Sequence, residues 1–87
     1  MTDLEKLTKY YNRIYDLYMK ASWEVPNDDY SNHYRKLVET VRWFMNDYQN
    51  EKDYLEIKKD CEYFVSGKKA KAGWKIRNIL AFLEERI

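Results

Sequence analysis

The sequence predicts an all-α protein, a compact antiparallel four-helix bundle built as a single domain over residues 1–87. Three observations lead to this fold class. Residues 27–66 contain neither Gly nor Pro, the whole chain has only two Gly and one Pro, and apolar residues recur at steps of three and four. Such spacing places one apolar stripe on each helix, and the shortage of turn-forming residues favours a few long elements. Three helices with a long bent central helix are the alternative.

The first helix is expected over Asp3–Ser22. Thr2 and Glu5 have the spacing of a capping box, in which two side chains satisfy free amides at a helix start. Pro26 ends the helix, because the residue before a proline is driven out of the helical region. Trp23 is expected to close the end of the bundle. The predicted apolar stripe consists of Leu4, Leu7, Tyr11, Ile14, Tyr18 and Ala21.

The second helix should begin at Asn27 or Asp28 and end near Tyr48, where a polar stretch follows. Asn50 could then cap a third helix that ends at Gly67. Whether the two helices are separate or one bent rod stays open. The stripe of the second helix is Tyr30, Tyr34, Leu37, Val38, Val41, Phe44, Met45 and Tyr48; that of the third is Tyr54, Ile57, Cys61, Phe64 and Val65.

The fourth helix is expected over Ala70–Glu85. The short connection of residues 66–69 predicts that it is an antiparallel neighbour of the third. Its core stripe is predicted to be Ala72, Ile76, Ile79, Leu80, Leu83 and Ile87.

Charge and cysteine content bear on the environment. The net charge is +1, with −3 over residues 1–57 and +4 over residues 58–87. The single cysteine allows no internal disulfide. Charged residues interrupt the N-terminal segment, and the longest apolar run, Ile79–Leu83, is too short to span a bilayer. These features predict a cytoplasmic protein without membrane contact.

The residues that carry catalytic chemistry are sparse. With His33 and Cys61 as the only residues of their kinds, the chain has no zinc-binding set and no local nucleophile pair. We expect Cys61 in the core and His33 at the rim. All-α nucleotide pyrophosphatases use two acidic pairs on facing helices, and Asp53 with Glu56 resembles only one of them. The Gly67–Lys75 segment lacks the spacing of a phosphate loop. We expect no enzymatic activity, no cofactor and no metal.

Two tryptophans lie out of phase with their helices. Trp43 points about 200° from Val41, and Trp74 points about 160° from Ile76. Asn78 and Phe82 continue the face of Trp74 at i+4 and i+8. Exposed aromatic residues are typical of binding hot spots, so Trp43, Trp74, Asn78 and Phe82 are the candidate partner-binding residues. Packing against the bundle is the alternative, above all if the last helix begins only at Trp74.

A basic segment surrounds Trp74. Positive charge beside a stacking platform is the combination used by nucleic-acid-binding proteins, and a solvated turn is the structural alternative. Lysines in the first turn also oppose the helix dipole, which suggests an anionic group nearby, either on a partner or among the acidic residues of the second helix. The candidate nucleic-acid-binding residues are Lys68, Lys69, Lys71, Trp74, Lys75 and Arg77.

Residues 73–80, which read Gly-Trp-Lys-Ile-Arg-Asn-Ile-Leu, resemble the last helix of sterile alpha motif domains. The preceding segments lack the rest of that pattern, so no property is carried over. The expected function is non-enzymatic binding of a macromolecule, most often a protein, by a Tyr/Trp-rich helical face. Small regulatory proteins of phages and mobile elements, including inhibitors, are frequently of this kind. Nucleic-acid binding through Lys68–Arg77 is the alternative, and a monomer and a homodimer are both open.

Overall fold

The computed structural model describes residues 4–23, 28–67 and 71–87, without the side chains of residues 21–23 and 28–31. The elements are the helices α1 (Leu4–Trp23), α2 (Asp28–Tyr48), α3 (Lys58–Val65) and α4 (Ala72–Glu84), with a short 3-10 helix, η1 (Lys52–Glu56), before α3. The described residues thus form an all-α four-helix bundle, as the sequence predicts. The Cα radius of gyration is 12.4 Å.

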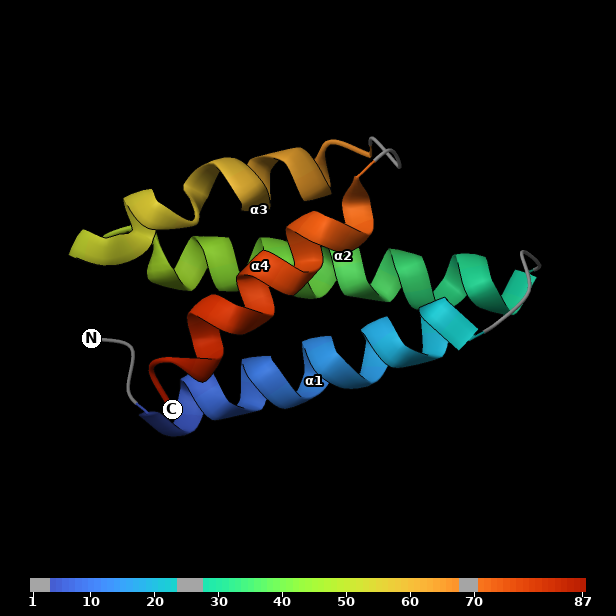
Figure 1. Cartoon of the computed structure of the whole chain (residues 1–87), viewed down its shortest axis with the longest axis horizontal. Helices are drawn as coiled ribbons and strands as arrows, with labels where there is room; N and C mark the ends of the chain where they lie inside the picture. Colours follow the sequence, from blue (N-terminus) through green and yellow to red (C-terminus); the bar gives the residue numbers. More distant parts are fainter. Residues whose placement is uncertain (1–3, 24–27, 68–70) are drawn as a thin grey trace.

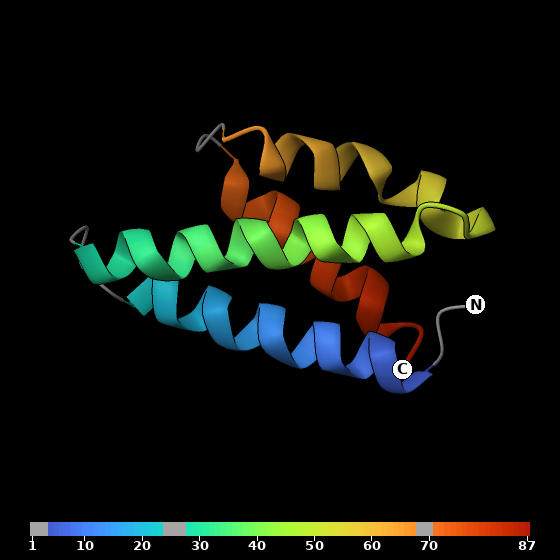
Figure 2. The ribbon, with the colours of Figure 1, turned by 180° about the vertical axis from the view of Figure 1, so that it is seen from behind.

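The helices are arranged as a three-helix layer with a fourth helix across one face. α1, α2 and α3 run alternately in opposite directions, with α2 in the middle (Figure 1). α4 crosses this layer obliquely, in front of α2 in Figure 1 and behind it in Figure 2. Because α4 covers only one face of the layer, the other face of α2 and α3 stays open to solvent.

The core lies between α4 and the three-helix layer. α1 contributes Leu7, Ile14 and Leu17, all of them on the apolar face expected for the first helix. The fully buried side chains form one continuous cluster, as expected for a single hydrophobic core. They are Ile14, Leu37, Val41, Phe44, Cys61, Phe64, Ile76, Ile79 and Leu83, and the polar side chain of Thr40 is buried as well.

The chain breaks between α2 and α3, so they are two separate helices and not one bent rod. The segment between them is held by three-residue backbone hydrogen bonds, from Tyr54 N to Glu51 O (3.1 Å) and from Ile57 N to Tyr54 O (3.0 Å). This tighter winding buries Tyr54 and Ile57 while the chain reverses. The predicted start at Asn50 is therefore wrong, since Asn50 lies in the preceding turn and α3 begins at Lys58.

The connection between α3 and α4 fits the prediction at one end and departs from it at the other. Gly67 adopts a φ of +86° just after α3, a conformation that glycine accepts without strain and that commonly ends helices. α4 begins at Ala72, two residues later than predicted. Lys71 precedes it with a φ of 66°, the only positive φ of a non-glycine residue in the described part of the chain.

Several smaller predictions have definite outcomes. Cys61 is buried, as expected. Leu4 and Ile87, both assigned to core stripes, are 59% and 43% exposed, since Leu4 is the first residue of α1 and Ile87 lies beyond the last residue of α4. The expected roles of Thr2 and Trp23 concern side chains outside the described residues. In the part of the chain that the structure describes, no helix combines the length and apolar character needed to cross a membrane.

Candidate docking surface on helix α4

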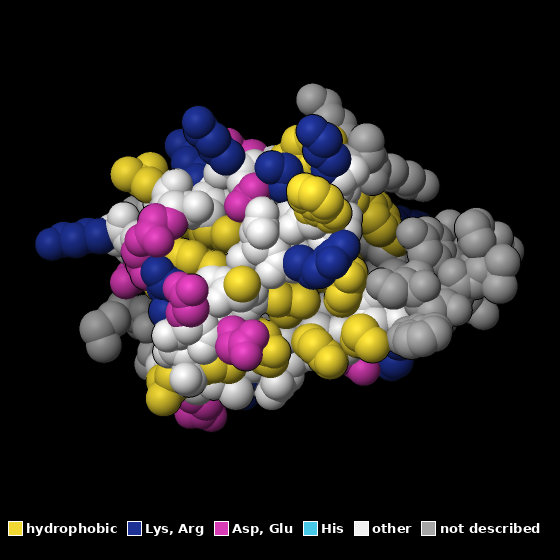
Figure 3. Space-filling model, viewed as in Figure 1, with side chains coloured by type: hydrophobic (Ala, Val, Ile, Leu, Met, Phe, Trp, Pro, Cys, Tyr) yellow, Lys and Arg dark blue, Asp and Glu magenta, His cyan; other side chains and the backbone are white. Residues whose placement is uncertain are grey.

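The exposed side of α4 presents Trp74, Arg77 and Asn78, which we name the α4 surface. These residues stand at i, i+3 and i+4, so they share one stripe, while Ile76, Ile79 and Leu83 occupy the buried side. Trp74 is 70% exposed. The three side chains line a shallow depression of about 230 Å³. Hydrophobic side chains bordered by Lys and Arg lie over the first half of α4 in Figure 3.

Phe82 does not belong to this surface, and its prediction as a partner-binding residue is corrected here. It is only 7% exposed. Eight residues at 100° each leave Phe82 about 80° away from Trp74, on the flank of α4 that meets α2. There its ring packs edge-on against Tyr48, with the ring centroids 5.8 Å apart.

A polar cluster covers Phe82 from the other side. The guanidinium carbon of Arg86 lies 3.5 Å from the Phe82 ring centroid, and Arg86 Nε donates to Asp53 Oδ2 at 2.5 Å. Tyr48 donates to the same oxygen at 3.1 Å. Burial by itself would raise the pKa of Asp53, but these hydrogen bonds outweigh it and hold the pKa below its usual value. The cluster therefore fastens the end of the chain to η1.

Some basic side chains at the start of α4 make contacts within the protein, so less of their charge is available to a ligand than the sequence suggests. Lys75 forms an ion pair with Asp60 of α3 at 3.0 Å and lies 5.3 Å from the ring centroid of Tyr63. The acidic partner for the first turn of α4 thus comes from α3, where the sequence pointed to the second helix or an external ligand. Arg77 Nε donates to Gly73 O at 3.3 Å, and Lys71 is exposed. Lys68 and Lys69 lie outside the described residues.

Trp43 belongs to a different part of the molecule, the seam between α1 and α2. It is 48% exposed, and its ring centroid lies 5.7 Å from the guanidinium carbon of Arg13. Arg13 Nε donates to Oγ1 of the buried Thr40 at 2.9 Å, and Thr40 donates to Lys36 O at 2.8 Å. Trp43 is thus exposed as its helical phase predicts, but it does not join Trp74 and Asn78 in one depression.

The same seam contains a second hydrogen-bonded acid. Tyr10 of α1 donates to Oδ2 of Asp47 on α2, and Lys6 Nζ lies 3.5 Å from that oxygen. The hydrogen bond from Tyr10 lowers the pKa of Asp47, with a further contribution from Lys6. Burial and the neighbouring carboxylate raise the pKa of Tyr10. Tyr10, Lys6 and Asp47 therefore join α1 to α2 and have a structural role.

The acidic pair and the cysteine thiol both lie in surroundings that indicate a structural role. Asp53 and Glu56, the single acidic pair, both face Arg86, at 2.5 and 3.7 Å. No group of three His, Cys, Asp or Glu residues suited to a metal ion occurs among the described side chains. Burial raises the pKa of Cys61 to about 12, so its thiol stays protonated at neutral pH.

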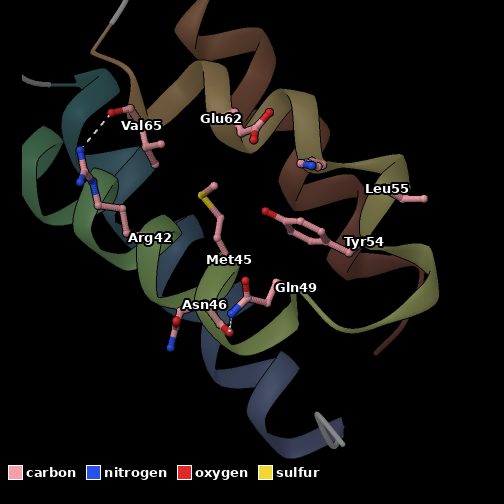
Figure 4. Close-up of a pocket in the computed structure, with 9 residues that line it drawn as sticks. Arg42, Met45, Asn46, Gln49, Tyr54, Leu55, Glu62 and Val65 are labelled. Atoms are coloured by element: carbon pink, nitrogen blue, oxygen red, sulfur yellow. Dashed lines mark hydrogen bonds between the residues drawn. The ribbon is translucent and has the colours of Figure 1, made fainter.

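Sequence reasoning missed a groove on the open face of α2 and α3, which we name the α2–α3 groove. Its volume is about 520 Å³. Figure 4 shows its walls, with the ribbon of α4 behind them. A signal existed in the sequence, because Leu55 falls outside the apolar stripe of Tyr54, Ile57 and Cys61. The lining residues are Arg42, Met45, Asn46, Gln49, Tyr54, Leu55, Lys58, Glu62 and Val65.

Comparison of the chain with protein-family models, curated proteins and solved structures finds no match to any of them. The function is therefore argued from the geometry alone.

Proposed function

We propose that this protein is a non-enzymatic binding protein whose α4 surface docks onto another protein. The observation that carries the proposal is the 70% exposure of Trp74 in the middle of a positively charged helix start. A tryptophan side chain offers roughly 150–250 Å² of contact area, most of which α4 leaves in water. Trp and Arg are the residue types enriched at binding hot spots, and Arg77 lies one turn from Trp74.

The expected partner surface is apolar at its centre and acidic around it. Lys71 and Arg77 are exposed, and α4 has no acidic residue in its first turn and no side-chain cap. The free amides and the helix dipole add to this positive potential. Lys71 also keeps a left-handed backbone, which costs roughly 1–2 kcal/mol for a non-glycine residue. A regulatory or inhibitory role in the cytoplasm, of the kind small phage proteins have, is the setting we propose.

Site-specific photo-crosslinking tests the proposal in cells. A benzoylphenylalanine residue at position 74 should capture one protein, and the purified partner should bind the Trp74→Ala variant about tenfold more weakly or worse. Trp43→Ala is the matched control, because it removes a second exposed tryptophan outside the α4 surface. If only the Trp43→Ala control lost binding, the interface would lie at the α1–α2 seam and not at the α4 surface. Equal affinity of both variants and the unmodified protein would refute docking by either tryptophan.

Nucleic-acid binding by the basic segment stays the alternative, although the ion pair of Lys75 with Asp60 reduces its available charge. It predicts that affinity for labelled DNA or RNA falls steeply with salt, because each phosphate contact releases counterions. Anisotropy titrations at two salt concentrations measure this dependence. Binding that disappears in a Lys71→Glu/Arg77→Glu variant would favour nucleic acid over protein.

A further inference from the structure

We propose that the α2–α3 groove is a second binding site, which takes a short segment of a partner protein carrying an apolar side chain beside a carboxylate. The site does not depend on the α4 surface. α4 lies behind the groove in Figure 4, and the exposed side of α4 faces away from α2 and α3. The two surfaces are therefore on opposite sides of the molecule, and one chain could contact two partners at once.

The apolar part of the ligand is indicated by the groove walls. Met45 and Val65 are partly buried and face each other across it, and Leu55 is 76% exposed at its edge (Figure 4). Leu55 is the most exposed large hydrophobic residue in the described part of the chain. A volume of about 520 Å³ accommodates one or two apolar side chains, and covering Leu55 with them removes apolar surface from water.

The Tyr54 hydroxyl supplies a hydrogen-bond donor at the wall of the groove. Tyr54 as a whole is only 7% exposed, but its hydroxyl, which makes no hydrogen bond within the described part of the chain, is not itself buried. Figure 4 shows this hydroxyl directed into the space between Met45 and Glu62. A phenolic O–H that faces the groove and has no partner in the protein is available to donate to a ligand. A carbonyl or carboxylate oxygen of a bound segment would accept from it.

The charges along the groove select an acidic segment. Arg42 donates one N–H to Val65 O at 3.2 Å, which leaves other donors of its guanidinium group for a ligand. Lys58 has no ion pair among the described residues. Glu62 opposes these two cations with a single negative charge, so the lining is net positive. A carboxylate next to the inserted apolar side chain would reach Arg42, whose planar donor fork suits it.

A peptide fits the groove better than a compact small molecule does. The groove is a depression in the surface and not an enclosed cavity, so an extended chain can lie across it. Asn46 and Gln49 line one wall with side-chain amides, and although Gln49 Nε2 donates to Asn46 O at 3.2 Å, each amide keeps donor and acceptor capacity suited to the backbone of an extended segment. The chemistry of the ligand is thus an extended peptide with an apolar anchor and an acidic neighbour.

Selection of phage-displayed random peptides on the full-length protein tests this site. The selected peptides should combine Leu, Ile or Phe with an adjacent Asp or Glu, and a labelled synthetic copy of the strongest one should bind measurably by anisotropy. Leu55→Asp and Arg42→Glu should each raise its Kd about tenfold, and Tyr54→Phe should raise it by a smaller factor. Leu55→Asp leaves folding intact because the side chain is exposed.

Trp74→Ala is the matched control, since it removes an equally exposed large residue from the opposite side. Its peptide affinity should equal that of the unmodified protein. The proposal is overturned if no peptide is enriched, if the enriched peptides lack acidic residues, or if Trp74→Ala weakens binding while Leu55→Asp does not. None of those results counts against the proposal for the α4 surface, because that proposal is tested with a different partner.

Discussion

Replacing Phe82 and Trp74 separately by alanine tests the division of α4 into a buried and an exposed side. Both residues belong to the same helix and both are large aromatics, but Phe82 is 7% exposed and Trp74 is 70% exposed. Phe82→Ala should therefore destabilise the protein strongly, whereas Trp74→Ala should leave its free energy of unfolding nearly unchanged.

The magnitude for Phe82 follows from its surroundings. A buried phenylalanine removes roughly 150 Å² from water, which at roughly 25 cal/mol per Å² amounts to about 3–4 kcal/mol. Loss of the edge-on contact with Tyr48 and of the Arg86 contact adds to this cost. Trp74→Ala should change stability by no more than about 0.5 kcal/mol, as is usual for exposed positions.

Urea unfolding followed by circular dichroism measures both values. If Phe82→Ala is too unstable to purify, Phe82→Leu should still unfold cooperatively at a lower urea midpoint than the unmodified protein. A destabilisation of Trp74→Ala as large as that of Phe82→Ala would show that the Trp74 ring packs against the bundle. That outcome would refute the α4 surface as a docking site.

The remaining predictions concern three buried or hydrogen-bonded groups. The pKa of Asp53 is lowered, so its carboxylate stabilises the folded protein above about pH 4. This contribution is lost as the pH falls through the lowered pKa. Asp53→Asn should therefore flatten the acid limb of a stability–pH curve. Thr40→Val should cost about 1 kcal/mol in urea unfolding, since Arg13 Nε loses its acceptor, and Thr40→Ser should cost clearly less. An equal loss in both would assign the effect to packing. With the pKa of Cys61 raised to about 12, a disulfide reagent should modify the folded protein at least about 100-fold more slowly than the urea-unfolded protein; equal rates would contradict its burial.

Local sequence signals determined the helices themselves. The three-and-four spacing of apolar residues and the shortage of Gly and Pro are enough to predict four helices, the end of α2 at Tyr48 and the burial of Cys61. Gly67 marked the end of α3, because its conformation is one that other residues adopt with strain. The exposure of Trp74 also followed from its phase, since neighbours at i+2 point to opposite sides of a helix.

Only the tertiary structure decided which flanks are covered and which remain open. Phe82 lies between the two sides of α4, and the oblique crossing of α4 brings Tyr48 and Arg86 onto its ring. The helical period of a single segment carries no information on that crossing. The α2–α3 groove likewise depends on η1, whose tighter winding turns Tyr54 inward and leaves Leu55 outside. The burial of Phe82 thus depends on contacts between residues distant in the sequence, and the groove on a local 3-10 turn together with the packing of α2 against α3, so the helical period alone predicts neither.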